Sequence, residues 1–344
     1  MSAVERAIRQ EILANGSISF ARFMELALYC PKIGYYERSA RPIGRNGDFY
    51  TSVSVGPLFG ELIGVQFAGW RSHLGAKSPI LVEAGAHDGQ LARDILSAVE
   101  ADLPLQYWII EPSEIRREWQ RAKLDVFAER VTWFASLDEM PEVLGILFCN
   151  ELLDALPVHV LRWQNGAWRE RKVALAGEQF VWRDEILERD LGQPTIPPQL
   201  AAILPEGFQI EVSPAATQWW QLAARKLRGG KLVTFDYGGE AEELLSPHRS
   251  GGTLRAYRAH RIETDVLANP GEQDITAHVN FTEVRRAGET AGLKTEFFGS
   301  QEKFLAQIVP KLNDWSSERV RQYQTLTHPD HLGRAFKVLV QSRW

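Results

Sequence analysis

The chain has 344 residues, of which 44% are hydrophobic and 24% charged, and its formal net charge is −5. This composition is sufficient for one large hydrophobic core or two smaller ones, and the scattered lysines and arginines argue against a nucleic-acid partner. The two cysteines, Cys30 and Cys149, lack the spacing of zinc ligands, so we expect neither a metal site nor a disulfide framework.

The N-terminal segment 1–30 is predicted to form two short helices broken at "NGS", with Ser19 as the N-cap of the second helix. The acidic residues Glu5 and Glu11 are not typical of a signal or transit peptide, and no apolar run is long enough to span a membrane. We therefore expect a cytoplasmic protein without a membrane span. A loop containing "GDFYTS" and a long apolar helix, "PLFGELIGVQFAGWRSHL", follow.

From residue 79, short apolar strands alternate with helices, which predicts a mostly parallel sheet with helices on both faces. The first four strands are "ILVEAG", "LQYWIIE", "RVTWFA" and "VLGILFCNE", and we expect a short helix at "LLDAL" after the fourth. This rhythm divides the chain into a helical N-terminal region, 1–78, and an α/β domain, 79–344.

Two stretches interrupt the alternation of strands and helices. The first, about 157–213, contains strand-like runs around Asn165-Gly166, a dipeptide that favours a two-residue hairpin turn. We expect an antiparallel insertion there. The second, about 240–281, is irregular.

The turn after the first strand, "VEAGAHDGQL", has the features of a nucleotide-cofactor site. Glu83, Gly85 and Gly89 fall where the strand passes into a helix, whose free backbone N–H groups favour an anionic group. Glu111 ends the second strand and can accept both hydroxyls of a ribose. The structural alternative is a tight turn followed by a surface glutamate.

The spacing of the glycines in this turn indicates which kind of nucleotide cofactor it could bind. His87 occupies the position where a dinucleotide-binding turn has its middle glycine, and no phosphate-binding lysine follows. An adenosyl group with a methionine tail fits better, because it needs a ribose acceptor but has no phosphates.

The fourth strand ends in "CNELLDALP", which predicts an acidic site at its tip. On a short helix, Asn150, Glu151 and Asp154 would lie on one face, where two carboxylates could hold a cationic nucleophile and accept its proton. The alternative is structural, with Asn150 as an N-cap and the two acids favoured by the helix dipole.

Together, these segments resemble the MidA family of S-adenosyl-L-methionine (SAM)-dependent methyltransferases, whose mitochondrial members methylate a protein arginine and assist the assembly of respiratory complex I. The matching stretches occur in the family's order and span most of the chain: "GDFYTS…FGELIG", "VEAGAHDGQLARDIL", "YWIIEPSEIRREWQ", "NELLDALPVHVL", "LVTFDYGG", "GGTLRAYRAH", "DITAHVNF" and "QEKFL".

The resemblance implies a class I methyltransferase (Rossmann-like) fold with a helical N-terminal region and an antiparallel β insertion. It assigns SAM as the cofactor and changes the interpretation of "GDFYTS" from a turn to part of the site. The implied cofactor residues are Asp48, Thr51, Ser52, Glu83, Gly85, Gly89, Glu111 and Pro112. The implied catalytic residues are Asn150, Glu151 and Asp154.

The resulting hypothesis is a SAM-dependent methyltransferase that modifies an arginine side chain of a protein substrate. The alternative is a methyltransferase fold with little or no activity that serves in binding or assembly, because Ala86 and His87 replace a proline and a glycine of the family's loop. Association into a homodimer stays open.

Overall fold

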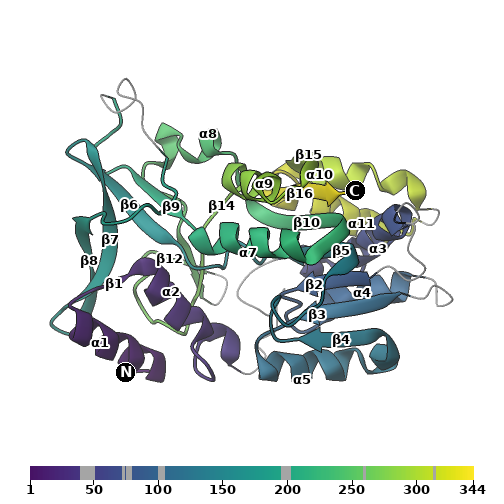
Figure 1. Ribbon diagram of the computed structural model, residues 1–344, viewed down its shortest axis with the longest axis horizontal. Helices are drawn as coiled ribbons and strands as arrows, with labels where there is room; N and C mark the ends of the chain where they lie inside the picture. The colour runs from purple at the N-terminus through teal and green to yellow at the C-terminus, as the bar shows by residue number, and fades with distance from the viewer. Residues whose placement is uncertain are drawn as a thin grey trace. The chain divides into compact units, whose positions relative to one another are not determined.

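The structure is a computed structural model that describes residues 1–38, 51–71, 74, 80–99, 105–194, 203–258, 261–312 and 315–344. The chain folds into two units (Figure 1). Unit 1 comprises Met1–Ser39, Leu153–Gln218 and Gly238–Val284, and unit 2 comprises Ala40–Leu152, Trp219–Tyr237 and Arg285–Trp344.

Unit 2 is built around seven strands of a sheet that has eight strands among the described residues; the eighth is β14 (Val279–Asn280). In spatial order the seven are β15 (Lys294–Ser300), β16 (Phe336–Arg343), β10 (Leu227–Gly239), β5 (Val143–Asn150), β2 (Ile80–Ala84), β3 (Gln106–Ile110) and β4 (Val131–Phe134). Strands β10, β5, β2, β3 and β4 are parallel to their neighbours, whereas β16 runs antiparallel to both β10 and β15. The predicted mostly parallel sheet is therefore confirmed, with antiparallel pairing around β16.

The chain order reverses between β2 and β5. From β2 the chain steps outward to β3 and β4, and it then returns to the other side of β2 to form β5 and β10. Ligands of open α/β sheets bind beyond the carboxyl ends of the strands at such a reversal. This reversal marks the place in unit 2 where a site is expected.

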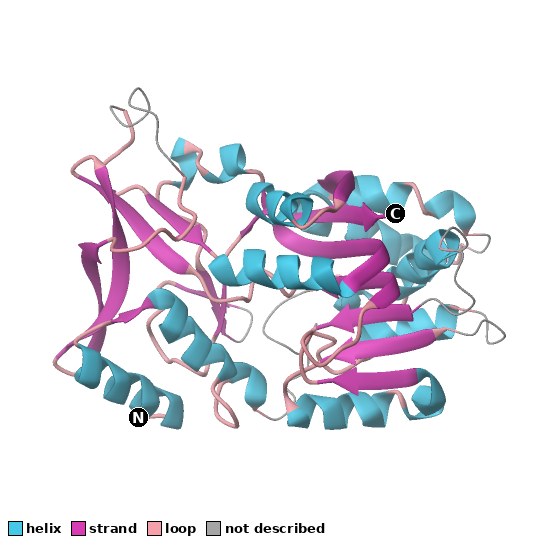
Figure 2. Cartoon of the chain, viewed as in Figure 1, coloured by secondary structure: helices cyan, strands magenta, loops and turns pink. Residues whose placement is uncertain are grey.

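Helices flank the sheet of unit 2, as the cartoon in Figure 2 shows. They are α3 (Leu58–Arg71), α4 (Gln90–Ala98), α5 (Glu114–Lys123), α7 (Pro214–Lys226), α9 (Phe281–Thr290), α10 (Gln301–Ala306) and α11 (Ser317–Thr327), with the unit boundary inside α7 and α9. Because parallel crossovers are right-handed, α4 and α5 lie on one face and α7 on the other.

The core of unit 2 follows from the apolar strands and the inward faces of the helices. In α4 the buried residues Leu91, Ala92, Ile95 and Leu96 recur at helical spacing, and they join Phe148 of β5 in one hydrophobic cluster. Seven of the eight β5 residues are apolar and most are buried, as expected for a central parallel strand.

Unit 1 combines short helices with two antiparallel sheets. Its elements are α1 (Ala3–Asn15), β1 (Ile18–Ser19), α2 (Phe20–Tyr29), β6 (His159–Gln164), β7 (Ala167–Ala176), β8 (Gln179–Ile186), β9 (Gln209–Val212), α8 (Ala241–Leu244), β11 (Arg255–Arg258), β12 (Arg261–Glu263), β13 (Asp274–Thr276) and β14 (Val279–Asn280).

The predicted antiparallel insertion is confirmed. Strands β6 and β7 form a hairpin in which Gln164 pairs with Ala167, and the turn residues Asn165 and Gly166 have φ of 51° and 76°. Positive φ at both positions is the signature of the turn that this dipeptide favours. The two-residue strand β1 adds to the edge of β7, a long-range pairing that the sequence did not indicate.

The predicted N-cap of the second helix, Ser19, is confirmed, and the first helix also has an N-cap, Ser2. The Ser2 side chain and Glu5 form a capping box at α1, and the Ser19 hydroxyl accepts the Arg22 N–H at the start of α2. The irregular stretch 240–281 contains α8 and the small sheet β12-β11-β13.

The predicted short helix at residues 152–156 is wrong. These residues form a turn in which the Leu156 N–H reaches the Leu153 carbonyl at 3.3 Å, and no helix is assigned there. A proline, Pro157, follows at once and lacks the N–H that would continue a helix.

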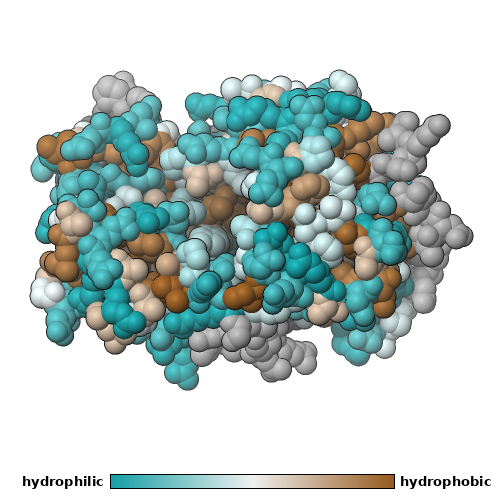
Figure 3. Space-filling model, turned by 60° about the horizontal axis from the view of Figure 1, so that its bottom comes forward, coloured by the Kyte–Doolittle hydropathy of each residue, from teal (hydrophilic) through white to brown (hydrophobic). Residues whose placement is uncertain are grey.

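The surface carries hydrophobic residues among hydrophilic ones on the face shown in Figure 3. The large hydrophobic side chains that are exposed include Leu13, Val126, Ile186 and Ile262, which come from different elements of the chain. Scattered exposure of this kind is usual for protein surfaces. Among the helices in the described ranges, none has both the length and the apolar character of a membrane span.

Candidate active site

Three strands of unit 2 deliver the predicted site residues to one edge of the sheet. Ala84, the last residue of β2, pairs with Ile110 of β3 on one side and with Cys149 of β5 on the other. The residues that follow these strand ends therefore meet at the carboxyl edge where the chain order reverses. They include Gly85, Glu111 and Glu151.

The loop from Gly85 to Gly89 needs both of its glycines. Their φ angles are 74° and 85°, in the region that favours glycine. A Cβ atom added to Gly85 would lie 3.0 Å from the Leu152 Cδ1 atom, and one added to Gly89 would lie 3.4 Å from the Gln120 Cα atom. A side chain at either position would combine backbone strain with crowding.

His87 occupies the middle of this loop with φ of 47°, the left-handed conformation that a glycine adopts at little cost. The strain does not prevent the turn: the His87 carbonyl accepts a hydrogen bond from Gln120 Nε2 at 2.9 Å. The imidazole is partly exposed, and its Nδ1 atom is buried without a hydrogen-bond partner. Burial lowers the pKa of His87, so the ring is neutral at pH 7.

Asp88 fixes the start of α4. One carboxylate oxygen accepts the Gln90 N–H at 3.1 Å, and the other lies 2.5 Å from Lys123 Nζ. Burial acts to raise the pKa of Asp88, but its interactions with His87 and with Lys123 outweigh it and hold the pKa well below its usual range. Asp88 therefore stays ionised and ties the loop to α5.

Glu111 lies directly after β3 and is 2% exposed. Its Oε1 atom accepts the Ser113 N–H at 3.0 Å and its Oε2 atom accepts Gln120 Nε2 at 3.2 Å, while an Arg116 nitrogen lies 3.9 Å from Oε2. The carboxylate is thus held in one orientation at the predicted ribose position. Pro112 follows it and is exposed.

Gln120 connects the loop to Glu111, a role that the sequence did not reveal. It is fully buried in α5, its Nε2 atom donates to both the His87 carbonyl and Glu111, and its Oε1 atom accepts Trp133 Nε1–H at 3.0 Å. In the sequence it lies within "REWQRAK", which reads as a solvated helix face. A glutamine in such a segment gives no signal of long-range contacts.

Glu83 lies inside β2 at the base of the loop, where it is 2% exposed. The Tyr107 hydroxyl donates to it at 2.6 Å. Burial raises the pKa of Glu83 to about 8, with contributions of the same sign from Asp88 and Glu111. Glu83 is therefore mostly protonated at pH 7, which keeps a second charge away from Glu111.

The tip of β5 combines an unsatisfied amide with a strained backbone. Asn150 Nδ2 donates to Glu151 Oε1 at 2.9 Å, whereas Asn150 Oδ1 is buried without a hydrogen-bond partner in the described part of the chain. Glu151 has φ of 53°, and its N–H donates to the Phe235 carbonyl at 2.8 Å. Strained residues of this kind cluster at functional sites.

Asp236 is an additional carboxylate at this edge. It is fully buried near the end of β10, and its Oδ2 atom accepts the Leu152 N–H at 3.2 Å. Asp236 is not among the residues predicted from the sequence, although it lies near the end of the apolar strand "LVTFDYGG", much as Glu111 lies at the end of its own strand.

Asp154 belongs to unit 1, so the expected common helical face with Glu151 does not exist. It is 7% exposed, and its carbonyl accepts the Ala277 N–H at 3.0 Å. Within unit 1 the Tyr36 hydroxyl donates to Asp274 at 2.8 Å. Burial is the main cause that raises the pKa of Tyr36. Nearby groups act in the same direction, Asp274 first and Asp154 among the others. Asp154 and Asp274 therefore both lie close enough to Tyr36 to affect its pKa.

Of the three predicted cofactor residues in "GDFYTS", the structure describes Thr51 and Ser52. Asp48 lies outside the described residues. Thr51 exchanges hydrogen bonds with Ser54, and the buried Ser52 hydroxyl donates to Gln301 Oε1 at 3.1 Å. Both hydroxyls therefore have protein partners in unit 2.

The residues at this edge fit an adenosyl cofactor with an amino-acid tail. Glu111 is a buried carboxylate held in one orientation, as the predicted acceptor of ribose hydroxyls would need to be. His87 Nδ1 and Asn150 Oδ1 are buried polar atoms that make no hydrogen bond in the described part of the chain, although Asp88 Oδ1 lies 3.7 Å from His87 Nδ1. A polar ligand would satisfy them.

Comparisons with known proteins identify the family of this chain and its cofactor. Residues 62–299 match the family described as "Putative S-adenosyl-L-methionine-dependent methyltransferase". The chain is 30% identical to "Protein arginine methyltransferase NDUFAF7 homolog, mitochondrial" of Drosophila melanogaster, over 98% of the chain and 84% of that protein. It is 28% identical to the Xenopus tropicalis protein arginine methyltransferase NDUFAF7, over 97% and 85%.

A solved structure is similar over nearly the whole chain. A Burkholderia thailandensis protein bound to S-adenosyl-homocysteine has a TM-score of 0.87 and 31% identity, covering 99% of this chain and 92% of that one. S-adenosyl-homocysteine is the product that SAM leaves after methyl transfer.

The predicted cytoplasmic location is contradicted, because the named relatives from Drosophila and Xenopus are mitochondrial proteins. That prediction rested on the composition of the N-terminal segment and on the lack of an apolar run long enough to span a membrane.

Proposed function

This chain belongs to the MidA family of SAM-dependent methyltransferases, and from this premise we propose that it methylates an arginine side chain of a protein. The acceptor is supported by the names of the Drosophila and Xenopus relatives, which are protein arginine methyltransferases. The observation that carries the proposal is the tip of β5, where Asn150 Oδ1 is a buried acceptor without a partner among the described residues and Glu151 is strained.

The cofactor residues of this proposal are those of the loop and of the adjacent strand end. Gly85 and Gly89 allow the backbone to approach the cofactor, and Glu111 accepts the ribose hydroxyls. Gln120 holds the loop and Glu111 in place through its hydrogen bonds to both. When bound, SAM supplies a methyl group made electrophilic by a sulfonium.

The remaining task of the protein is to prepare the nucleophile. A guanidinium is protonated at any physiological pH and is a poor nucleophile in that form. We assign Glu151 to orient the guanidinium through charge-assisted hydrogen bonds and to accept the proton released as the new N–C bond forms. The catalytic role predicted for Asp154 is tested separately, because Asp154 belongs to unit 1. Asn150 would hold the Glu151 carboxylate through its 2.9 Å hydrogen bond.

The test is transfer of labelled methyl groups from SAM to arginine-containing proteins and to the same proteins with lysine in place of arginine. Glu151→Gln and Asp154→Asn should lower the rate at least tenfold while SAM affinity stays within a few-fold. Glu142→Gln, at the exposed start of the same strand, is the matched control and should leave the rate unchanged. Loss of SAM binding in both site variants would assign these carboxylates to the cofactor pocket or to the fold.

The alternative function is a binding or assembly protein without turnover, and His87 is the observation that favours it. The same assay separates the two functions. Wild-type protein that binds SAM but transfers no methyl group to any arginine substrate would support the alternative. The hydrogen bond from Gln120 to the His87 carbonyl supports a loop that still binds the cofactor.

A further inference from the structure

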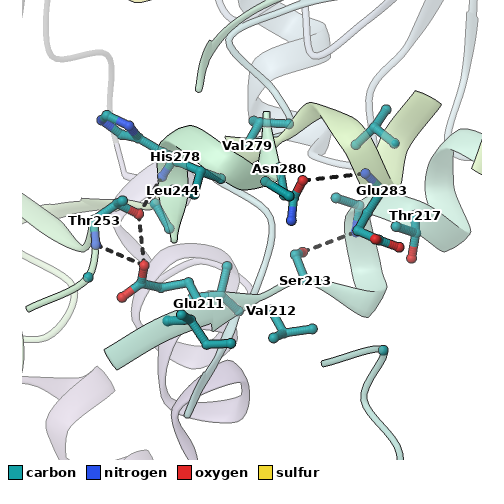
Figure 4. Close-up of a pocket in the computed structure, with 18 of the residues that line it drawn as sticks. Glu211, Val212, Ser213, Thr217, Leu244, Thr253, His278, Val279, Asn280 and Glu283 are labelled. Carbon is teal, nitrogen blue, oxygen red and sulfur yellow. Dashed lines mark hydrogen bonds between the residues drawn. The ribbon is translucent and has the colours of Figure 1, made fainter. Parts of the chain in front are cut away.

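Unit 1 contains a cavity of about 140 Å³ that the site described above does not use (Figure 4). The residues that line it include members of β9, of the first turns of α7 and α9, of α8 and of the segment 252–253. Its apolar wall includes Leu153, Val158, Val212, Leu244, Val279 and Val284. A cavity of about 150 Å³ holds a six-carbon ring, so there is room for about six or seven non-hydrogen atoms.

Glu211 places a carboxylate at this otherwise largely apolar cavity. One carboxylate oxygen accepts both the N–H and the hydroxyl of Thr253 at 2.8 Å (Figure 4). The other accepts Gln209 Nε2 at 3.2 Å. All of these donors are neutral. Burial raises the pKa of Glu211, although its hydrogen bonds with Thr253, Gln209 and the Leu254 N–H act to lower it. None of these partners is a cation that could neutralise the carboxylate.

The other charged and titratable groups of the lining do not supply that cation. Burial, assisted by Arg249 and Arg255, lowers the pKa of His278 to about 4, so its imidazole is neutral at pH 7. Glu283 lies in the first turn of α9, where an acid complements the helix dipole. Within the described residues, the cavity lining includes neither lysine nor arginine.

The N-termini of the two lining helices are already capped. Asn280 Oδ1 accepts the Glu283 N–H at 3.4 Å, and the Ser213 hydroxyl accepts the Ala216 N–H at 3.1 Å (Figure 4). These caps and the negative charge of Glu283 offset the positive ends of the helices. Outside the lining, Arg249 Nη1 lies 3.2 Å from His278 Nδ1. The charged residues of the lining itself, Glu211 and Glu283, are both acidic, so the cavity favours a cation over an anion.

We propose that this cavity binds an alkylguanidinium or alkylammonium group, with the cationic head on Glu211 and the stem against the apolar wall. An arginine side chain has seven non-hydrogen atoms beyond Cα, which matches the volume. The group is either the basic side chain of a protein partner or a free small cation. The inference does not rest on the proposed methyl transfer, because it concerns binding to unit 1 without SAM.

The test is calorimetric titration of the full chain, without SAM, with n-propylguanidinium and with n-propylurea. The two probes have the same number of non-hydrogen atoms, but only the first is charged. Wild-type protein should bind propylguanidinium saturably and at least about tenfold more tightly than propylurea, the factor expected for one hydrogen bond to a charged group.

Two variants locate the binding. Glu211→Gln should remove the preference for propylguanidinium, and Leu244→Trp, which fills the cavity from its wall, should weaken binding of both probes. Glu178→Gln is the matched control, because it removes a charge from an exposed position of unit 1 away from the cavity lining. Circular dichroism establishes that each variant is folded. If Glu211→Gln does not fold, the proposal is still tested by the affinities of wild-type protein for the two probes and by the weaker binding expected of Leu244→Trp.

Three results would overturn the proposal: no saturable binding of propylguanidinium by wild-type protein, equal affinity for the two probes, or an unchanged preference in folded Glu211→Gln. A blocked peptide, acetyl-Gly-Arg-Gly-amide, then distinguishes the sources of the cation. Tighter binding than propylguanidinium assigns the cavity to a protein side chain, whereas exclusion of the peptide with retained propylguanidinium binding assigns it to a free small cation.

Discussion

Replacing Gln120 with leucine should weaken SAM binding as well as the fold. The substitution removes two hydrogen bonds with neutral partners, the His87 carbonyl and Trp133 Nε1, and one with the Glu111 carboxylate. At about 1 kcal/mol for each neutral hydrogen bond and about 1.5–3 kcal/mol for the charged one, the free energy of unfolding should fall by about 3–5 kcal/mol. Glu111 and the loop would also lose their shared support, so SAM affinity should fall by about tenfold, or 1.4 kcal/mol.

A second glutamine of unit 2 provides the control. Gln341 is also fully buried, and it too accepts an indole N–H, from Trp220 at 2.8 Å. Its Nε2 atom donates to the Arg285 carbonyl and to the Thr295 hydroxyl, both at 2.9 Å. Gln341→Leu should therefore lower the free energy of unfolding by about 3 kcal/mol, but it should leave SAM affinity unchanged.

The two quantities are measured separately, stability by urea denaturation and SAM affinity by calorimetry at a temperature where circular dichroism finds all three proteins folded. A structural role alone would make the two leucine variants indistinguishable in SAM affinity. Folded Gln120→Leu protein that binds SAM as tightly as wild type would refute the reasoning.

Three further predictions concern single residues of the same edge. Glu111→Ala should weaken SAM binding by about 1.5–3 kcal/mol, and unchanged affinity in calorimetry would remove Glu111 from the ribose role. His87→Gly should relieve strain of about 1 kcal/mol and leave SAM binding intact or tighten it by no more than about tenfold, whereas binding that appears only in the variant would show that the histidine blocks the pocket. Because the pKa of Glu83 is raised from 4.5 to about 8 in the folded protein, its contribution to stability is fully present below pH 4.5 and is lost as the pH rises towards 8. Glu83→Gln should therefore be more stable than wild type at pH 8 and show a weaker decline in urea-denaturation midpoints between pH 4.5 and 8, and an unchanged decline would contradict the assignment.

The elements that local chemistry determines could be predicted from the sequence. Asn165-Gly166 specifies its hairpin because both residues tolerate positive φ, and Ser19 specifies a helix start because its side chain satisfies a free N–H group. The parallel sheet followed from short apolar strands alternating with helices. At the site, the glycine loop, Glu111 and the tip of β5 were all placed at strand ends, and the structure brings them to one edge.

The contacts that could not be predicted join residues far apart in the chain. Gln120 reaches back 33 residues to His87, and β1 pairs with β7 through Ile18 and Val173. The helix expected at 152–156 failed for a related reason. Its acidic and apolar residues suit a helical turn, but the Leu152 N–H is held by Asp236, which lies 84 residues later.

The interleaved order of the two units has a consequence for biosynthesis. The chain passes from one unit to the other after residues 39, 152, 218, 237 and 284, so neither unit is a continuous segment. The apolar faces of α1 and α2, which include Ile8 and Phe23, share their hydrophobic cluster with Val173 and Ile275. On the ribosome these faces emerge long before their partners, and they must wait for more than two hundred further residues before Ile275 is made. We expect chaperones to bind the apolar surface that the nascent chain exposes over that interval. Truncation at any of the five crossings would leave the core of at least one unit incomplete.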